Sequence, residues 1–348
     1  MSKEHLIPAA FIGRFSNDTT RKHRTRLVNI CRKDGTILKN KPARTIGYEH
    51  HAYDIDPTIS PKNGNKAIDK IWDQYETKLN PAIDALEAHS LTINDWINVL
   101  VLFVAGLFSR SNEFADRVTR RNDTLDQPLK DVANTVDNIN LNRPLEMSQY
   151  ATKLLSYKWS VYQANGHLIM PDLGYTIALK SQNSNDIEFW IPLDQKTMLV
   201  LSPEPRHVLA RKKNGVWIPN INYIAPSVYY FRAADTNLEL VKNSENFLVG
   251  EQKALEAINL PNSNMGLLIK DLDCYLHKSP FDSLAPRGLY EIVRDFFNGE
   301  ILDFNVPLDP IGLLRSAIPD TTICNTNLET ELANKYCTLT DDDITINV

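Results

Sequence analysis

The first fifteen residues place polar groups among apolar ones in an arrangement that is unusual for a chain terminus. His5 and Pro8 stand among the apolar side chains Leu6, Ile7, Phe11, Ile12 and Phe15. Chain ends are commonly polar and frayed. The apolar density therefore predicts that this N-terminal segment packs into the protein.

Residues 24–40 alternate between apolar and polar positions on both sides of a short polar break. The break is Lys33-Asp34-Gly35, and Asp-Gly between alternating segments is a strong hairpin signal. The pattern predicts a β-hairpin over 24–40.

Helical spacing begins near Lys66, where apolar and aromatic residues recur at Ile68, Trp72, Tyr75 and Leu79. We expect Pro81 to kink or split this helix. Two further helices are predicted over 126–138 and 145–156.

A second helix should start at Thr92-Ile93-Asn94-Asp95, which resembles a capping box, and run to about Arg121. Its segment from Trp96 to Phe108 is apolar on nearly all faces, which is typical of a buried helix. A membrane span needs about 20 apolar residues. The segment is shorter, so we interpret it as a core helix and expect no membrane contact.

After Tyr157 the pattern changes to short apolar or alternating runs separated by turn residues, which predicts a mostly antiparallel sheet. Helices are expected over 244–258 and 286–298. The predicted fold is α+β, with a helical N-terminal half that carries a basic β-hairpin and packs on a sheet from the second half. We expect one domain over 1–260, composed of a hairpin arm (1–56), a helical part (66–156) and a sheet plus helix (157–260), followed by a C-terminal appendage (261–348).

Charge is uneven along the chain. The net charge is −5, but residues 1–50 hold eleven Lys or Arg against four Asp or Glu. A basic N-terminal arm of this kind is able to contact nucleic-acid phosphates. It also fits a solvated hairpin that faces an acidic patch of the same protein.

Other signals narrow the functional classes. The four cysteines form no Cys-x-x-Cys pair, and the start of the chain shows no signal-peptide pattern, so a cytoplasmic protein without a disulfide framework is expected. The glycines form no phosphate-binding loop. The sequence does not indicate a protein partner or an oligomeric state.

Several spaced motifs resemble the bacterial family known as domain of unknown function 4238. The N-terminal His-x-x-Pro-x-x-aromatic-x-x-x-Phe signature lies at His5, Pro8, Phe11 and Phe15; the other matching positions are Tyr53, Asp69, Glu76, Arg110-Ser111, Trp159, Asp172 and Pro192-Leu193. The family's Ser-Asp-x-Pro turn is matched here only by Asp172. The resemblance covers roughly residues 3–260 and implies an α+β fold in a bacterial or phage-linked setting, but no reaction.

Arg110 is the residue with the clearest chemical requirement. It lies at the end of the apolar segment of a helix that should be buried, and a buried guanidinium needs an anionic partner. Asp69, Glu76 and Asp172 are the candidate partners. The pair would be either an internal salt bridge between helices or a site that binds a ligand.

Two functional hypotheses fit these residues. In the first, the chain is a bacterial hydrolase, a metal-assisted nuclease-like effector in phage defence or bacterial conflict. His5 would then act as acid or base, Glu76 and Asp172 as bases or ligands of a divalent metal, and Arg110 as anion binder. In the second, it is a non-catalytic binding or assembly protein, whose polar cluster is a buried structural network.

Overall fold

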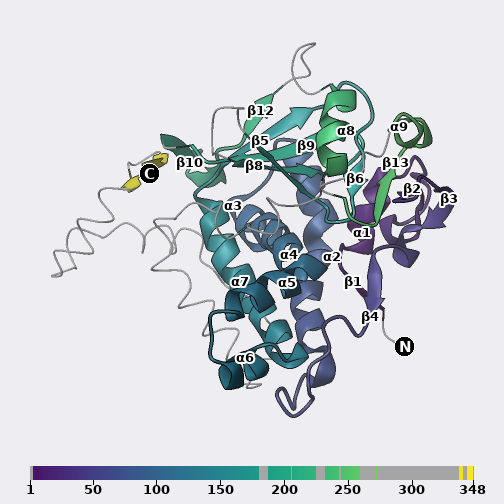
Figure 1. Cartoon of the computed structure of the whole chain (residues 1–348). Helices are drawn as coiled ribbons and strands as arrows, with labels where there is room; N and C mark the ends of the chain where they lie inside the picture. Colours follow the sequence, from purple (N-terminus) through teal and green to yellow (C-terminus); the bar gives the residue numbers. More distant parts are fainter. Residues whose placement is uncertain are drawn as a thin grey trace. The chain divides into compact units, whose positions relative to one another are not determined.

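The computed structural model describes residues 3–179, 187–204, 206–224, 232–242, 244–258, 272, 337–339 and 343–347. It confirms the α+β class, because helices dominate the N-terminal half and antiparallel sheets follow (Figure 1). The chain divides into two compact units: unit 1 contains Met1–Ala52, Trp159–Ser202 and Asn222–Tyr275, and unit 2 contains Tyr53–Lys158, Pro203–Ile221 and Leu276–Val348. The helix predicted over 286–298 lies outside the described residues.

The N-terminal segment of unit 1 is packed, as the sequence predicted. Strand β1 (Lys3–His5) pairs antiparallel with β4 (Tyr48–His50). Helix α1 (Ala9–Ile12) and the 3-10 turn η1 (Gly13–Phe15) follow. The apolar side chains of this segment are buried: Ile7, Phe11, Ile12 and Phe15.

The predicted hairpin is also confirmed. Strands β2 (Leu27–Arg32) and β3 (Ile37–Pro42) pair antiparallel, between the 3-10 turns η2 (His23–Thr25) and η3 (Ala43–Thr45). Gly35 has a φ of 82°, which a side chain disfavours, and the Asp34 carboxylate accepts a hydrogen bond from the Thr36 N–H at 2.9 Å. The tight turn thus explains the Asp-Gly signal.

The hairpin belongs to a four-stranded sheet in the order β3-β2-β13-β6, completed by β13 (Phe247–Gly250) and β6 (Met170–Pro171). The prediction of a helix over 244–258 is therefore wrong in its first half. Leu248 and Val249 are both buried, which suits a strand with neighbours on each side. Helix α9 (Gln252–Glu256) starts only after Glu251, whose side chain caps it.

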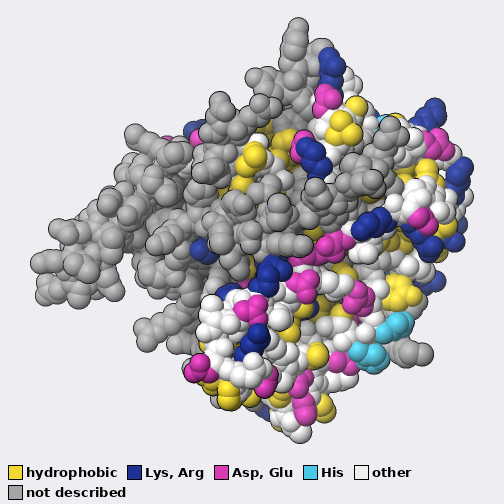
Figure 2. Space-filling model, in the orientation of Figure 1, with side chains coloured by type: hydrophobic (Ala, Val, Ile, Leu, Met, Phe, Trp, Pro, Cys, Tyr) yellow, Lys and Arg dark blue, Asp and Glu magenta, His cyan; other side chains and the backbone are white. Residues whose placement is uncertain are grey.

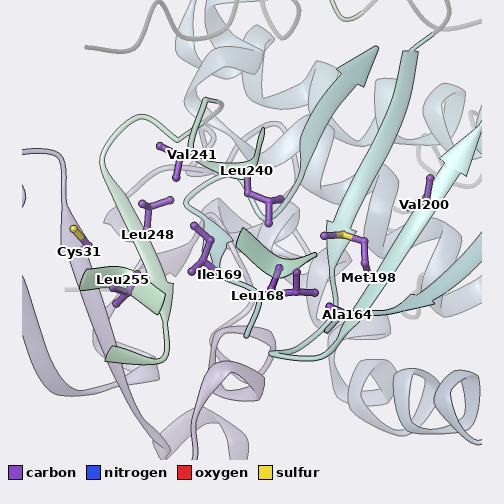
Figure 3. Close-up of a cluster of buried hydrophobic side chains, with 11 residues drawn as sticks. Cys31, Ala164, Leu168, Ile169, Met198, Val200, Leu240, Val241, Leu248 and Leu255 are labelled. Atoms are coloured by element: carbon purple, nitrogen blue, oxygen red, sulfur yellow. The ribbon is translucent and has the colours of Figure 1, made fainter. Parts of the chain in front are cut away.

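A second sheet of unit 1 has the order β12-β5-β9-β8-β7. Its strands are β5 (Lys158–Gln163), β7 (Thr176–Leu179), β8 (Ile187–Pro192), β9 (Thr197–Ser202) and β12 (Asn222–Ile224). Strand β12 runs parallel to β5, whereas β7, β8 and β9 pair antiparallel. Helix α8 (Ala233–Lys242) contributes Leu240 and Val241 to a buried cluster with Leu168, Ile169 and Leu248 (Figure 3).

Unit 2 is mainly helical. Its helices are η4 (Gly64–Lys66), α2 (Ala67–Glu87), α3 (Ile93–Asp95), a π-helical segment (Trp96–Val101), α4 (Leu102–Arg110), α5 (Asn112–Asn122), α6 (Gln127–Ala133) and α7 (Val136–Leu155). Helix α2 is continuous through Pro81, so the expected split does not occur. Both Pro81 and Thr77, whose carbonyl loses its helical donor, are solvent-exposed, so water is able to satisfy that carbonyl.

The central apolar helix starts as predicted but ends earlier. Thr92 Oγ1 accepts a hydrogen bond from the Asp95 N–H at 3.0 Å. The chain then leaves the helix at Ser111, where ψ is 163°, and not near Arg121. The span Ile93–Arg110 is apolar and long enough to cross a membrane, but 83% of it is buried inside the protein. It fits a core helix.

A small sheet in the order β11-β10-β15-β14 completes the described part of unit 2. Its strands are β10 (Arg206–Lys213), β11 (Val216–Pro219), β14 (Cys337–Leu339) and β15 (Asp343–Asn347). Strand β15 pairs antiparallel with β10, so residues near the end of the chain join a sheet formed from its middle.

Candidate functional site

The polar centre of unit 2 is an ion pair between Arg110 and Glu76. Helix α4 ends at Arg110, whose Nη1 donates to Glu76 Oε1 and, at 3.4 Å, to the hydroxyl of Tyr75. The exposed fraction of the side chain is 2% for Arg110 and 22% for Glu76. This confirms that Arg110 pairs with a carboxylate and identifies Glu76, one of the three candidates, as a partner.

Aromatic rings enclose the Arg110 guanidinium. Its Cζ lies 5.3 Å from the ring centre of Trp72 and 5.9 Å from that of Tyr53. Burial alone lowers the pKa of Arg110, but the Glu76 charge and the two tyrosine hydroxyls outweigh it and hold that pKa above its ordinary value. Arg110 is therefore a permanent cation whose charge is balanced within unit 2.

Gly106 makes this approach of α2 and α4 possible. A Cβ at this position would lie 2.3 Å from the Tyr75 hydroxyl oxygen. The glycine one turn before Arg110 thus brings the Tyr75 hydroxyl within reach of the guanidinium. Burial is the main reason that the pKa of Tyr75 is raised, and this hydroxyl therefore remains protonated at neutral pH.

The carbonyl groups at the end of α4 are satisfied by two further arginines. Arg117 Nη2 donates to the carbonyl of Phe108 at 2.7 Å. Arg143 Nη1 donates to the carbonyls of Ser109 at 2.6 Å and Ser111 at 3.1 Å. The last carbonyls of a helix lack internal donors and carry partial negative charge, so guanidinium groups there are stabilising.

Tyr53 completes this cap. Its hydroxyl donates to the Arg110 carbonyl at 3.1 Å, and its ring lies 5.2 Å from Arg143 Cζ. Sequence reasoning missed Arg117 and Arg143, although a signal was present for Arg117. Arg117 lies between Phe114 and Val118 on the buried stripe of α5, where an arginine needs polar partners.

His5 and Asp172 belong to unit 1 and have partners there. The Nε2 atom of half-buried His5 lies 3.2 Å from the Arg44 carbonyl, and its ring is 6.0 Å from that of Tyr48. The described contacts of His5 thus connect it to the segment around β4.

Asp172 holds the turn that precedes β13. Its Oδ1 accepts from Ser244 Oγ at 3.1 Å and from the Glu245 N–H at 2.9 Å, and its Oδ2 accepts from the Asn246 N–H at 2.6 Å. Burial raises the pKa of Asp172 despite these hydrogen bonds, which favour the charged form. Both carboxylate oxygens are thus engaged in shaping residues 244–246.

The four predicted site residues separate into two sets. Arg110 and Glu76 form one contact within unit 2, whereas His5 and Asp172 make separate contacts within unit 1. Among the described residues, no three His, Cys, Asp or Glu side chains form a group that could hold a metal ion. Convergence of all four residues and a divalent metal at Glu76 and Asp172 stay predictions.

A second candidate site is the basic arm, which we define as the nine Lys and Arg residues between positions 21 and 44. Asp34 is the one acidic residue from 21 to 47. Eight of the nine cations are exposed: Arg21, Lys22, Arg24, Arg32, Lys33, Lys39, Lys41 and Arg44. Figure 2 shows Lys and Arg side chains gathered on the side where Figure 1 labels β2 and β3.

An open cavity of 690 Å³ lies beside part of the basic arm. Three cations line it, Arg32, Lys33 and Lys41. The apolar lining residues are Ile30, Leu38, Ile46 and Phe247. The cavity thus joins positive charge to apolar surface, which suits an anion that also carries an apolar group.

The chain matches no family model, no curated protein and no solved structure. The resemblance to family 4238 therefore stays a prediction from the motifs.

Proposed function

We propose that this chain is a non-catalytic protein that binds the phosphate backbone of nucleic acid through its basic arm. The observation that carries this proposal is the concentration of eight exposed cations on one hairpin and its flanking turns, with one acidic residue among them. Such a surface attracts phosphates independently of sequence and releases counterions when it binds.

The pairing of these cations supports the same interpretation. Within the part of the chain that the structure describes, Lys22, Arg24, Lys33, Lys39 and Lys41 take part in no ion pair. Solvated lysines and arginines at this density are available for phosphate oxygens. A hairpin neutralised by its own protein would instead place acids against these side chains.

The Arg110 centre favours a structural over a catalytic role. A reacting group must be reached by a substrate, but the Arg110 side chain is 2% exposed and is engaged by Glu76, Tyr75 and two aromatic rings. The arginines beside it cap the end of α4.

The test is the salt dependence of binding to a random-sequence DNA duplex, measured by fluorescence anisotropy. The triple variant Lys22→Ala/Arg24→Ala/Lys39→Ala should bind roughly tenfold or more weakly and should reduce the slope of log K against log [salt] by about 2 to 3. The matched control Lys70→Ala/Lys78→Ala/Lys253→Ala removes three exposed cations outside the basic arm. Equal losses in both triple variants, or no binding by the wild type, would show that the basic arm is not the binding surface.

A further inference from the structure

The walls of the cavity come from two parts of unit 1 that are distant in sequence, the hairpin with the turn that follows it and strand β13. The hairpin contributes Ile30 and Leu38, the turn before β4 contributes Ile46 and Gly47, and β13 contributes Phe247. Its 690 Å³ is within the usual range of small-molecule sites, about 300–1,000 Å³. A single nucleotide unit fits a cavity of this size.

Phe247 gives the cavity an aromatic wall. The residue is half-buried, and Gly47 lies against it, since a Cβ on Gly47 would be 3.3 Å from Phe247 Cζ. Gly47 also has a φ of 60°, which favours glycine. The glycine therefore leaves room for the ring beside the turn.

The position of Phe247 is fixed by pairing with strand β2 and by the turn that precedes β13. It pairs with Arg32 across the β2–β13 ladder, and the Lys33 N–H donates to the Asn246 carbonyl at 3.1 Å. Asp172 fixes the preceding turn through the three hydrogen bonds described above. Asp172 is thus a positioning residue for the aromatic wall.

The charges of the cavity suit the backbone of a strand that enters it. Arg32, Lys33 and Lys41 line the cavity together with one acid, Asp34. The Asp34 carboxylate accepts a hydrogen bond from Thr36, and Asn246, whose side chain is exposed, also lines the cavity. The cavity therefore combines three kinds of group. Its cations can contact phosphates, its aromatic ring can stack on a base, and its amide can hydrogen-bond to a base edge.

We infer that the cavity receives one unpaired nucleotide of a single-stranded nucleic acid, with its base against Phe247 and its phosphates near Arg32, Lys33 and Lys41. This inference rests on the proposed function and specifies its substrate class. Bases in a duplex are stacked and paired and cannot reach Phe247, whereas a single strand can turn a base into the cavity. Single strands therefore bind more tightly than duplexes of equal length.

The test compares fluorescein-labelled 15-nucleotide oligo(dT) and oligo(U) with a 15-base-pair duplex, using the full chain. Phe247→Leu should weaken binding of a single strand about tenfold, because base–aromatic stacking is lost, and should change duplex binding less than twofold. Phe247→Tyr, which keeps the ring, should bind like the wild type. The control Trp190→Leu removes a half-buried aromatic residue that does not line the cavity and should change neither affinity. A preference for oligo(dT) or oligo(U) shows which strand the cavity takes.

Cross-linking keeps the inference testable if Phe247→Leu misfolds. A strand that carries 5-iodouracil should cross-link to the peptide containing Phe247 in the wild type. If all probes bind through the basic arm but Phe247→Leu changes none of them and no such cross-link forms, the inference is wrong and the proposed function stands. If no probe binds, both are wrong.

Discussion

The ion pair between Arg110 and Glu76 permits a quantitative prediction about stability. In Glu76→Gln the guanidinium loses the Glu76 carboxylate and stays buried, because the Arg110 side chain is 2% exposed. Removing one partner of a buried pair costs about 3–5 kcal/mol. In Arg110→Met the remaining carboxylate is 22% exposed and can recruit water, so we expect a smaller loss, about 2–3 kcal/mol. The order of the two losses follows from the unequal exposure of the partners.

The double variant Glu76→Gln/Arg110→Met gives the sharper test. It removes both charges of the pair, so its loss should be smaller than that of Glu76→Gln alone, about 1–2 kcal/mol after the hydrogen bond to Tyr75 is removed. The coupling free energy between the two positions should then be at least about 3 kcal/mol in magnitude. Urea unfolding followed by tryptophan fluorescence measures these values, since Trp72 and Trp96 are buried in unit 2.

Two results would refute the reasoning. The first is a loss below about 1 kcal/mol in both single variants, which would mean that the pair behaves like a surface ion pair. The second is additivity of the two losses in the double variant. If Arg110→Met were as stable as the wild type but lost the activity that the wild type shows in cells, the hydrolase hypothesis would be favoured instead.

Two further predictions concern packing and pH. Gly106→Ala should destabilise the protein by about 1–3 kcal/mol, because its Cβ would meet the Tyr75 hydroxyl at 2.3 Å. This loss should exceed the gain from the better helix propensity of alanine. Adding Tyr75→Phe to the same chain should recover part of the loss in urea unfolding. Asp172→Asn should cost about 1–3 kcal/mol, because one carboxylate oxygen that accepts an N–H is replaced by a donor. Burial raises the pKa of Asp172, so the folded state binds its proton more tightly than the unfolded state, and the stability that Asp172 contributes is largest below about pH 4 and falls as pH rises towards the raised value. The difference in free energy of unfolding between the wild type and Asp172→Asn should therefore decrease above pH 4. Urea titrations at successive pH values measure this difference, and an increase with pH would contradict the prediction.

Local sequence signals predicted the elements whose stability is local. The Asp34-Gly35 turn, the Thr92 cap and the apolar face of α2 each depend on residues a few positions apart, and each is observed. The requirement that Arg110 be paired was also visible, because burial of a guanidinium has one common solution. The identity of its partner depended on how α2 and α4 pack, which no single segment determines.

Errors arose where distant residues decide the structure. Residues 247–250 resemble part of a helix when considered alone, but they form β13 because β2 and β6 lie on either side of them. Arg143 gave no signal as a cap, since its acceptors at Ser109 and Ser111 are more than thirty positions away. The role of Asp172 was hidden for the same reason, because its donors at residues 244–246 follow more than seventy positions later.

The pairing of β2 with β13 has a consequence for how the protein is made. Strand β2 ends at Arg32 and its partner begins at Phe247, so the ribosome must polymerise more than two hundred further residues before the ladder can close. Residues 53–158 form a continuous part of unit 2 and are synthesised well before that partner. A nascent chain arrested before Phe247 would carry the cations of the hairpin without the wall that shapes their cavity. Maturation of that surface is thus a late event in translation.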